Sequence, residues 1–411
     1  PAAGMSFSTP IPWPTSTDRR PERPGRTPVT FPQSLWQREA RLDFRGGGPL
    51  SWALICTASP LTWRGGSHKA LRRRLFAHRR PRCMPASPHA PAVLDQAPAT
   101  ESFREAALEG LRKPQKHIPA KFHYDARGSE LFDQICRLDE YYPTRTEMAI
   151  MEEHVGAMAE ALGPRARLVE YGSGSSLKTR ILLDHLDDLA AYVPVDISKE
   201  HLIESASDLA TDYPSLPIQP VCADYTTAFD LPEPPVPAAR TVGYYPGSTI
   251  GNFQRPDARA FLQHVAETVG PEGGLLIGVD LKKDTEVMKA AYNDAEGVTA
   301  AFNKNLLRRM NRELNATFDL DAFEHRVRWN DERGCVESHL RSHIAQTVTV
   351  AGETISFDAG ETIHTEDSHK YTLDGFAALA GDAGFRVETV WTDERSYFSV
   401  QYCTVISESG A

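Results

Sequence analysis

The chain has 411 residues, 41% hydrophobic and 24% charged, which is typical of a globular protein of two or three domains. Its net charge of −10 is unevenly spread. Residues 1–83 hold fifteen basic and four acidic residues, and the rest of the chain holds 30 basic and 51 acidic residues. So acidic a body argues against a nucleic-acid partner, and the lack of any run of eighteen apolar residues argues against a membrane span. The six scattered cysteines form no zinc-binding pattern, so we expect no metal, and free thiols in a reducing cytoplasm.

Residues 1–83 are rich in proline, arginine and glycine and have no helical or strand periodicity. Such a composition buries too little apolar surface to offset chain entropy, so we expect a disordered segment. It has three interpretations: a transit peptide, a basic interaction tail, or an extension that is not native to the protein. We favour the last, because globular patterning begins only after Met84.

From Glu101 the pattern is helical, and from Arg167 short apolar strands alternate with amphipathic helices. The strands are predicted at 167–172, 190–196, 218–224, 240–248 and 274–280. The helices between them are predicted at 178–189, 200–211 and 256–269. This alternation predicts an α/β fold with a doubly wound, Rossmann-like parallel sheet.

After Asp280 the order changes. A helical stretch is predicted at 284–315, followed by strands of an antiparallel insert at 324–330, 336–343, 346–351, 354–357 and 361–367. A helix at 373–384 and strands at 386–391 and 397–406 close the chain, the two strands as an edge hairpin of the first sheet. We therefore expect one domain over 95–283 and 371–411, and a second, α+β lobe over 284–370.

Three features lie at the carboxyl ends of consecutive predicted strands. They are the glycine–serine turn that contains Gly172, the acid Asp196, and the pair Asp224-Tyr225. Each has a purely structural alternative, either a tight turn or a helix cap. Together they indicate a nucleoside-bearing cofactor, because open α/β sheets bind ligands at that edge. No phosphate-binding P-loop motif is present.

Two further motifs carry polar groups suited to a substrate. The stretch 245–253 follows the fourth strand, where Asn252 offers an amide and Gly247 allows close backbone approach. In 365–371, strand alternation places Glu366 and Ser368 on one face, where they could hold a donor-bearing ring such as imidazole. The alternatives are a simple turn and a solvated polar strand.

These motifs together resemble the bacterial histidine N-alpha-methyltransferases of ergothioneine biosynthesis, from about Glu101 to Val405. The stretches that carry the resemblance are YDARGSELFDQICRLDEYYPTRTE (124–147), LVEYGSGSSLKTR (168–180), YYPGSTIGNF (244–253), AYNDAEGVTAAFNKNLL (291–307) and IHTEDSHKYT (363–372). The resemblance implies a methyltransferase that uses S-adenosyl-L-methionine and trimethylates the α-amino group of L-histidine, giving hercynine. It makes the first domain the cofactor domain and the second lobe the substrate-binding lobe.

The resemblance also implies residue roles. Cofactor binding falls to Tyr124, Gly172, Lys178, Asp196, Asp224 and Tyr225. Substrate binding falls to Tyr141, Asn252, Tyr292, Ser338, Glu366 and Ser368, with Asn252 and Tyr292 on the carboxylate and Glu366 and Ser368 on the imidazole. Tyr124 would line the methyl-transfer centre, and we expect Gly247 and Asn252 to complete the set of catalytic residues.

One position departs from the family pattern. Family members usually carry Glu-Met-His-Leu where this chain reads Glu337-Ser338-His339-Leu340. The smaller Ser338 keeps open the methylation of another amino acid or amine, such as tryptophan or an indole alkaloid precursor. Rivals from other classes are a catalytically silent cofactor-binding protein and a nucleotide-dependent oxidoreductase. We expect a monomer, because no heptad pattern or long apolar stripe stands out.

Overall fold

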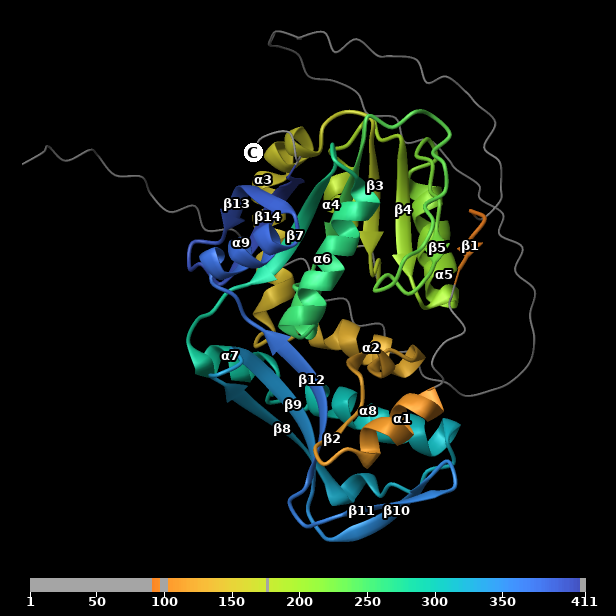
Figure 1. Ribbon diagram of the computed structural model, residues 1–411, viewed down its shortest axis with the longest axis vertical. Coiled ribbons are helices and arrows are strands. Elements are labelled where there is room, and N and C mark those ends of the chain that lie inside the picture. The colour runs from red at the N-terminus through yellow and green to blue at the C-terminus, as the bar shows by residue number, and fades with distance from the viewer. Residues whose placement is uncertain (1–90, 97–102, 175–176, 407–411) are drawn as a thin grey trace, which may run out of the picture. The chain divides into compact units, whose positions relative to one another are not determined.

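The computed structural model describes residues 91–96, 103–174 and 177–406, so the expectation for residues 1–83 lies outside the described residues. Its largest sheet has the strand order β1-β5-β4-β3-β6-β7-β14-β13 (Figure 1). These strands are β1 (Leu94–Asp95), β3 (Ala166–Tyr171), β4 (Ala191–Asp196), β5 (Val221–Cys222), β6 (Arg240–Tyr245), β7 (Gly274–Asp280), β13 (Phe385–Thr392) and β14 (Phe398–Val405). All pairings from β1 to β7 are parallel, while β14 and β13 add an antiparallel edge. The predicted doubly wound sheet and its edge hairpin are therefore confirmed.

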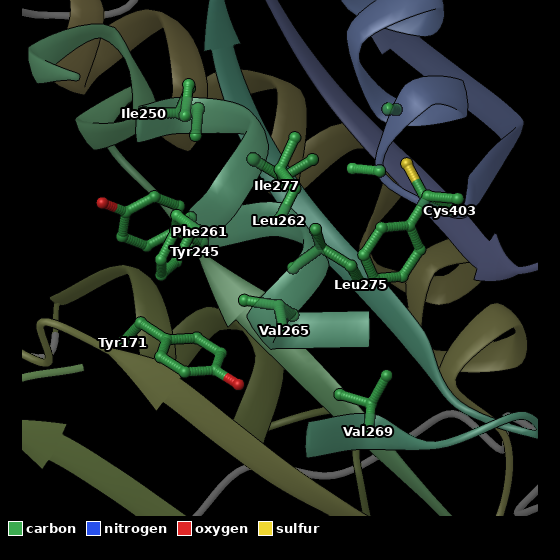
Figure 2. Close-up of a cluster of buried hydrophobic side chains, with 14 of the residues drawn as sticks. Tyr171, Tyr245, Ile250, Phe261, Leu262, Val265, Val269, Leu275, Ile277 and Cys403 are labelled. Carbon is green, nitrogen blue, oxygen red and sulfur yellow. The ribbon is translucent and has the colours of Figure 1, made fainter. Parts of the chain in front are cut away.

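Helices cover both faces of this sheet, because side chains alternate along each strand. On β3, Val169 and Tyr171 join one core and Leu168 joins the other. The first core includes residues of α6 (Arg255–Val269) and α9 (Leu373–Asp382). Figure 2 shows the Tyr171, Tyr245 and Phe261 rings of this core near one another. The second core includes residues of α3 (Tyr142–Leu162), α4 (Leu177–Leu183) and α5 (Lys199–Asp212).

One strand of this sheet and one of the helices that cover it are shorter than predicted. The strand expected at 218–224 is reduced to the two residues of β5, although Ile218 still forms an isolated bridge with Tyr192. Helix α4 ends at Leu183, whereas the periodicity predicts a helix to 189. There the chain tightens into i→i+3 hydrogen bonds, from the His185 amide to Leu182 and from the Leu186 amide to Leu183, which end the helix.

A second lobe contains a four-stranded sheet of order β2-β12-β9-β8 and a separate hairpin, β10-β11 (Figure 1). Its elements are β2 (Lys116–His117), α7 (Thr285–Ala291), α8 (Val298–Glu313), β8 (Phe323–Asn330), β9 (Cys335–Ser342), β10 (Gln346–Val350), β11 (Glu353–Phe357) and β12 (Thr362–His369). The helical stretch predicted over 284–315 consists of two helices, α7 and α8, with a break between them. Asp294 caps α8 by accepting hydrogen bonds from the Val298 and Thr299 amides. The residue before α8, Gly297, has the left-handed φ of 76°.

The segment with α1 (Phe103–Arg112) and β2 packs against the second lobe, whereas the expected domain division places it in the first domain. Helix α1 buries Leu108 and Leu111 in one core with Leu306 and Leu307 of α8. Strand β2 then pairs in parallel with β12. By these contacts the segment joins the second lobe, although the sequence division places it with the first domain.

None of the described helices is long and apolar enough to cross a membrane. The four cysteines in the described part of the chain, Cys136, Cys222, Cys335 and Cys403, are free thiols.

Candidate active site

The turn after β3 lies directly beside an aromatic ring. Gly172 has φ 75°, and its amide donates to the Val195 carbonyl at the end of β4. A Cβ at this position would lie 3.6 Å from Cε1 of Tyr225, so any larger residue would fill the space beside that ring. The Tyr225 ring meets the rings of Tyr171 and Phe261 edge-on at 6.1 and 5.8 Å, and these contacts hold it in place.

Two carboxylates stand at the same edge. Asp196 accepts a hydrogen bond from the Ser198 amide at 2.8 Å, and Asp224 accepts from the Thr226 amide and hydroxyl at 3.0 and 2.6 Å. Burial raises the pKa of the Asp196 carboxyl. Both acids thus cap turns, which was the structural alternative for them. A carboxylate has two oxygens, so capping is compatible with ligand binding at this edge.

Glu147 of α3 connects Lys178 to the turn after β6. Its buried carboxylate lies 2.5 Å from Nζ of Lys178 and accepts hydrogen bonds from the Gly247 amide at 2.9 and 3.0 Å. Lys178 keeps 17% of its side chain exposed, whereas Glu147 keeps 1%. Glu147 therefore fixes the position of the Lys178 ammonium, and the Lys178 side chain stays partly exposed.

The turn after β6 positions Asn252. Gly247 and Ser248 both have left-handed φ, 79° and 56°, and the Ser248 hydroxyl accepts from the amide of Asp280. The 3₁₀ helix η2 (Thr249–Asn252) follows, and its Gly251 packs so closely on β12 that a Cβ would lie 2.8 Å from the His369 carbonyl oxygen. The Asn252 side chain makes no hydrogen bond to any described residue.

Tyr124 and Tyr141 enter the site from an aromatic cluster beside the second lobe. Tyr124 follows the 3₁₀ helix η1 (Ala120–His123), and its ring meets Phe132 of α2 (Ala126–Ile135) and Phe302 of α8 edge-on, each at 5.6 Å. Tyr141 precedes α3, and its ring meets that of Tyr292 edge-on at 6.1 Å. Burial raises the pKa of Tyr141, and the neighbouring Tyr292, Tyr124 and Glu366 raise it further.

Glu366 and Ser338 face each other in the register between β12 and β9. Burial raises the pKa of Glu366 to about 7, against the lowering effect of nearby Lys370. No described residue donates a hydrogen bond to its carboxylate. Glu366 is half-buried, so its carboxylate loses part of its hydration and gains no protein donor in return, as is typical of a group that binds a ligand donor. On the same strand, the Ser368 hydroxyl lies 2.6 Å from that of Tyr292.

The opposite face of this strand pair carries a buried charge network. Cys335, Glu337 and Asp367 place their donor atoms within 4.8 Å of one another, as metal ligands can. Here, however, both carboxylates are paired with cations. Arg333 bonds to Glu337 and Asp367 at 2.8 and 2.7 Å. Burial opposes ionisation, but hydrogen bonds from Asn330 and Arg328 lower the pKa of Glu337 to about 2. The network therefore holds β9 and β12 together on the face opposite to Glu366 and Ser338.

The sequence prediction missed Glu147, Asp280 and Lys370. Asp280 ends the fifth parallel strand, and the argument applied to Asp196 and Asp224 would have singled it out. Lys370 follows Glu366 and Ser368 at the same two-residue spacing, so alternation also pointed to it. Glu147 lies in the stretch 124–147 but received no role, because its partners Lys178 and Gly247 are distant along the chain.

This edge provides what S-adenosylmethionine requires: carboxylates for hydroxyl and amino donors, open space beside an aromatic ring at Gly172, and an ammonium for a carboxylate. A doubly wound sheet with these groups at the carboxyl ends of its strands defines an S-adenosylmethionine-dependent methyltransferase. Residues 103–405 match the model of the family described as histidine-specific, S-adenosylmethionine-dependent methyltransferases. The chain belongs to that family.

Similar proteins include a histidine N-alpha-methyltransferase of Mycolicibacterium smegmatis, 42% identical over 307 residues that cover 74% of this chain and 94% of the relative. The Ergothioneine biosynthesis protein 1 of Neurospora crassa is 31% identical over 73% of this chain and 35% of its own length. A 4-dimethylallyltryptophan N-methyltransferase of Epichloe festucae var. lolii is 28% identical over 74% of this chain and 96% of its own length.

Proposed function

We propose that this chain transfers three methyl groups in succession to the α-amino nitrogen of L-histidine and yields hercynine for ergothioneine biosynthesis. The observation that carries the substrate assignment is the half-buried carboxylate of Glu366, which has no hydrogen-bond donor among the described residues and a raised pKa. An imidazole N–H would satisfy it, whereas an apolar ring would leave it desolvated and unpaired. Membership of the histidine-specific family supports the same assignment.

S-adenosylmethionine, when bound, supplies an electrophilic methyl group. We assign its binding to the groups at the strand ends, with Asp196 and Asp224 accepting hydrogen bonds and Tyr225 covering the adenine beside Gly172. Lys178 would hold the carboxylate of the cofactor, and Tyr124 would close the site at the methyl end. The anchored ammonium of Lys178 and the open space at Gly172 support these roles.

We assign the carboxylate of histidine to Asn252 and Tyr292, and its imidazole to Glu366 and Ser368. Tyr141 would line the site between the two ends of the substrate, and Ser338 would bound the ring pocket. The short contact between Tyr292 and Ser368 supports a compact site that holds a small amino acid at both ends.

The main task of the protein is then to aim the lone pair of the amine, because an oriented pair of reactants loses little further entropy on reaction. Tyr124 and the backbone near Gly247 would orient the nitrogen. Its proton would leave to water before attack, and the surrounding low-dielectric rings favour the neutral amine. The faces of Tyr124 and Tyr141 would stabilise the positive charge that the product carries, through cation–π contact.

A second candidate function is methylation of a larger amine, such as tryptophan or an indole alkaloid precursor. The small Ser338 opposite Glu366 favours it, because a longer side chain there would fill part of the ring pocket. Glu366 argues against it, since a pocket sized for a large apolar ring has little use for a carboxylate without a partner. Histidine therefore remains the preferred substrate.

We further propose that the enzyme is a cytoplasmic monomer, with a cofactor domain over 95–283 and 371–411, of which α1 and β2 pack against the second lobe, and a substrate-binding lobe over 284–370. The free thiols of the described cysteines are consistent with a reducing compartment. Sedimentation of the purified protein at the mass of one chain would support the monomer, and a dimer mass would contradict it.

The experiment that tests the function is mass spectrometry of the products after incubation of the full chain with S-adenosylmethionine and each amino acid separately. We expect one, two and three added methyl groups on histidine and none on the others. Methylation of tryptophan but not of histidine would favour the second candidate. The absence of product with every amino acid would overturn both and favour a catalytically silent binder.

A further inference from the structure

Lys370 carries a charge that is fully buried beside the substrate groups. Its side chain is 0% exposed, and its Nζ lies 2.6 Å from the carboxylate of Asp280, which is 1% exposed. The same Nζ donates hydrogen bonds to the Tyr292 hydroxyl and the Ser368 hydroxyl, each at 2.8 Å. A cation this deeply buried must use all its donors, and these three contacts use them all.

One of the two hydroxyl protons of Tyr292 and Ser368 is not used by the hydrogen bonds of this cluster. Tyr292 and Ser368 both accept from Lys370, and their oxygens lie 2.6 Å apart, so one hydroxyl donates to the other. The two hydroxyls have two protons, and the contact between them uses one. The remaining proton has no acceptor among the described residues and is available to a ligand.

We propose that Lys370 is a positioning residue of the substrate site, which holds the Tyr292–Ser368 hydroxyl pair so that it presents one hydrogen-bond donor to the amino-acid substrate. The partner of this donor is an acceptor group, either a carboxylate or an unprotonated ring nitrogen. This inference rests on the proposed function, because both hydroxyls are assigned there to histidine. Asp280 at the end of β7 fixes the ammonium, and so links the cofactor sheet to the substrate lobe.

Lys283 provides a matched control within the same cluster. It is also buried, with 4% of its side chain exposed, and it also pairs with Asp280. Its second hydrogen bond, however, goes to the Tyr142 hydroxyl at 2.6 Å, and it makes none to Tyr292 or Ser368. Substitution of either lysine therefore removes a buried cation from Asp280, but only Lys370 touches the hydroxyl pair.

The test compares Lys370→Met with Lys283→Met in the full chain, with KM and kcat for histidine and the dissociation constant of S-adenosylmethionine as readouts. We expect Lys370→Met to raise the KM of histidine about tenfold, the effect of one hydrogen bond to a charged group, and to leave cofactor affinity unchanged. Lys283→Met should change the KM of histidine less than about twofold, because Lys283 bonds to Asp280 and Tyr142 and not to Tyr292 or Ser368.

A double-mutant cycle separates positioning from a general structural role. In a Tyr292→Phe/Ser368→Ala background, Lys370→Met should raise the KM of histidine no further, because the groups through which it acts are absent. An equal rise in that background, or an unchanged KM in the single variant, would overturn the proposal. If Lys370→Met does not fold, Tyr292→Phe and Ser368→Ala remain. Each single variant should raise the KM of histidine nearly as much as the double variant does. Additive effects of the two substitutions on binding free energy would contradict a shared donor. Failure of the wild-type chain to methylate histidine would instead overturn the proposed function.

Discussion

Glu366 lies opposite Ser338 across the antiparallel pair β12–β9, and the backbone of β12 shifts register by a bulge just before Glu366. The bulge re-aims the strand so that Asp367 joins the charge network on one face while Glu366 faces the small hydroxyl of Ser338 on the other. Glu366 therefore has a fixed position, and the small Ser338 leaves space beside it. This arrangement is suited to bind a ring that carries an N–H donor.

Substitution of Glu366 tests this selection directly. Glu366→Ala should weaken the binding of histidine by about 1.5–3 kcal/mol, the usual worth of a hydrogen bond to a charged group. Isothermal titration of histidine measures the change, and the affinity for S-adenosylmethionine, measured in the same way, should not move. Unchanged histidine affinity would show that Glu366 does not bind the imidazole.

The raised pKa of Glu366 predicts a pH dependence of binding. The carboxyl titrates at about 7 in the folded protein, and its ionised form is the one that accepts an imidazole N–H. Histidine should therefore bind more tightly as the pH rises from about 6 to about 8, in a range where the free imidazole also loses its proton. Equilibrium binding is the proper measurement, because turnover also follows the ionisation of the α-amine. Glu366→Gln should flatten the profile, and a variant with the wild-type profile would assign the titration elsewhere.

The same pKa has a consequence for stability. A carboxyl whose pKa rises from 4.5 in the unfolded chain to about 7 in the folded protein binds its proton more tightly when folded. Its contribution to the free energy of unfolding is therefore fully present below about pH 4.5 and is lost as the pH rises toward 7. Relative to wild type, Glu366→Gln should gain stability across that window in chemical denaturation. A constant difference between the two proteins would contradict the linkage.

Restoring the family residue opposite Glu366 tests the second substrate class. Ser338 is 4% exposed, and methionine at this position would extend into the ring pocket. Ser338→Met should lower kcat/KM for tryptophan at least about tenfold relative to histidine, because overpacking of a filled site costs about 1–3 kcal/mol. Competition between the two amino acids, resolved by mass spectrometry, measures the ratio. An unchanged ratio would show that Ser338 does not bound the ring pocket.

Glu147 should contribute more to stability than any exposed carboxylate of its helix. Glu147→Gln removes the charge that pairs with Lys178 and weakens the bond to the Gly247 amide, so we expect a loss of about 1–3 kcal/mol in the free energy of unfolding. Glu152→Gln, an exposed change on the same helix, should stay within about 0.5 kcal/mol. Urea denaturation compares the two, and equal effects would contradict the role of Glu147.

Gly251 should be required for the position of Asn252. An added Cβ would lie 2.8 Å from the backbone of His369, so Gly251→Ala forces η2 and β12 apart. We expect a stability loss of about 1–3 kcal/mol and a higher KM for histidine. Gly156→Ala is the matched control, because no atom lies within 4 Å of its added Cβ in the middle of α3. It should stabilise the protein by about 0.5–1 kcal/mol without affecting KM. Similar KM values for both variants would contradict the argument.

Much of the fold follows from local patterns in the sequence. The run GLLIGVD at 274–280 becomes β7 at those bounds, because a continuous apolar stretch between turns suits a strand buried on both faces. The break between α7 and α8 was missed, since the Asp294 cap and Gly297 override a helical periodicity that continues on both sides. The packing of α1 on α8 was also missed, because an apolar stripe shows which face of a helix is buried but not what it packs against.

Sequence alone determined the edge of the sheet at which Gly172, Asp196 and Tyr225 gather, and the shared face of Glu366 and Ser368. Strand direction and two-residue alternation fix these relations without further information. Only the tertiary structure decided which charges pair inside the site. Glu147 meets Gly247 across 100 positions of the chain, and Lys370 meets Tyr292 across 78. Such contacts depend on how separate elements pack against one another, and no local pattern of residues encodes that packing.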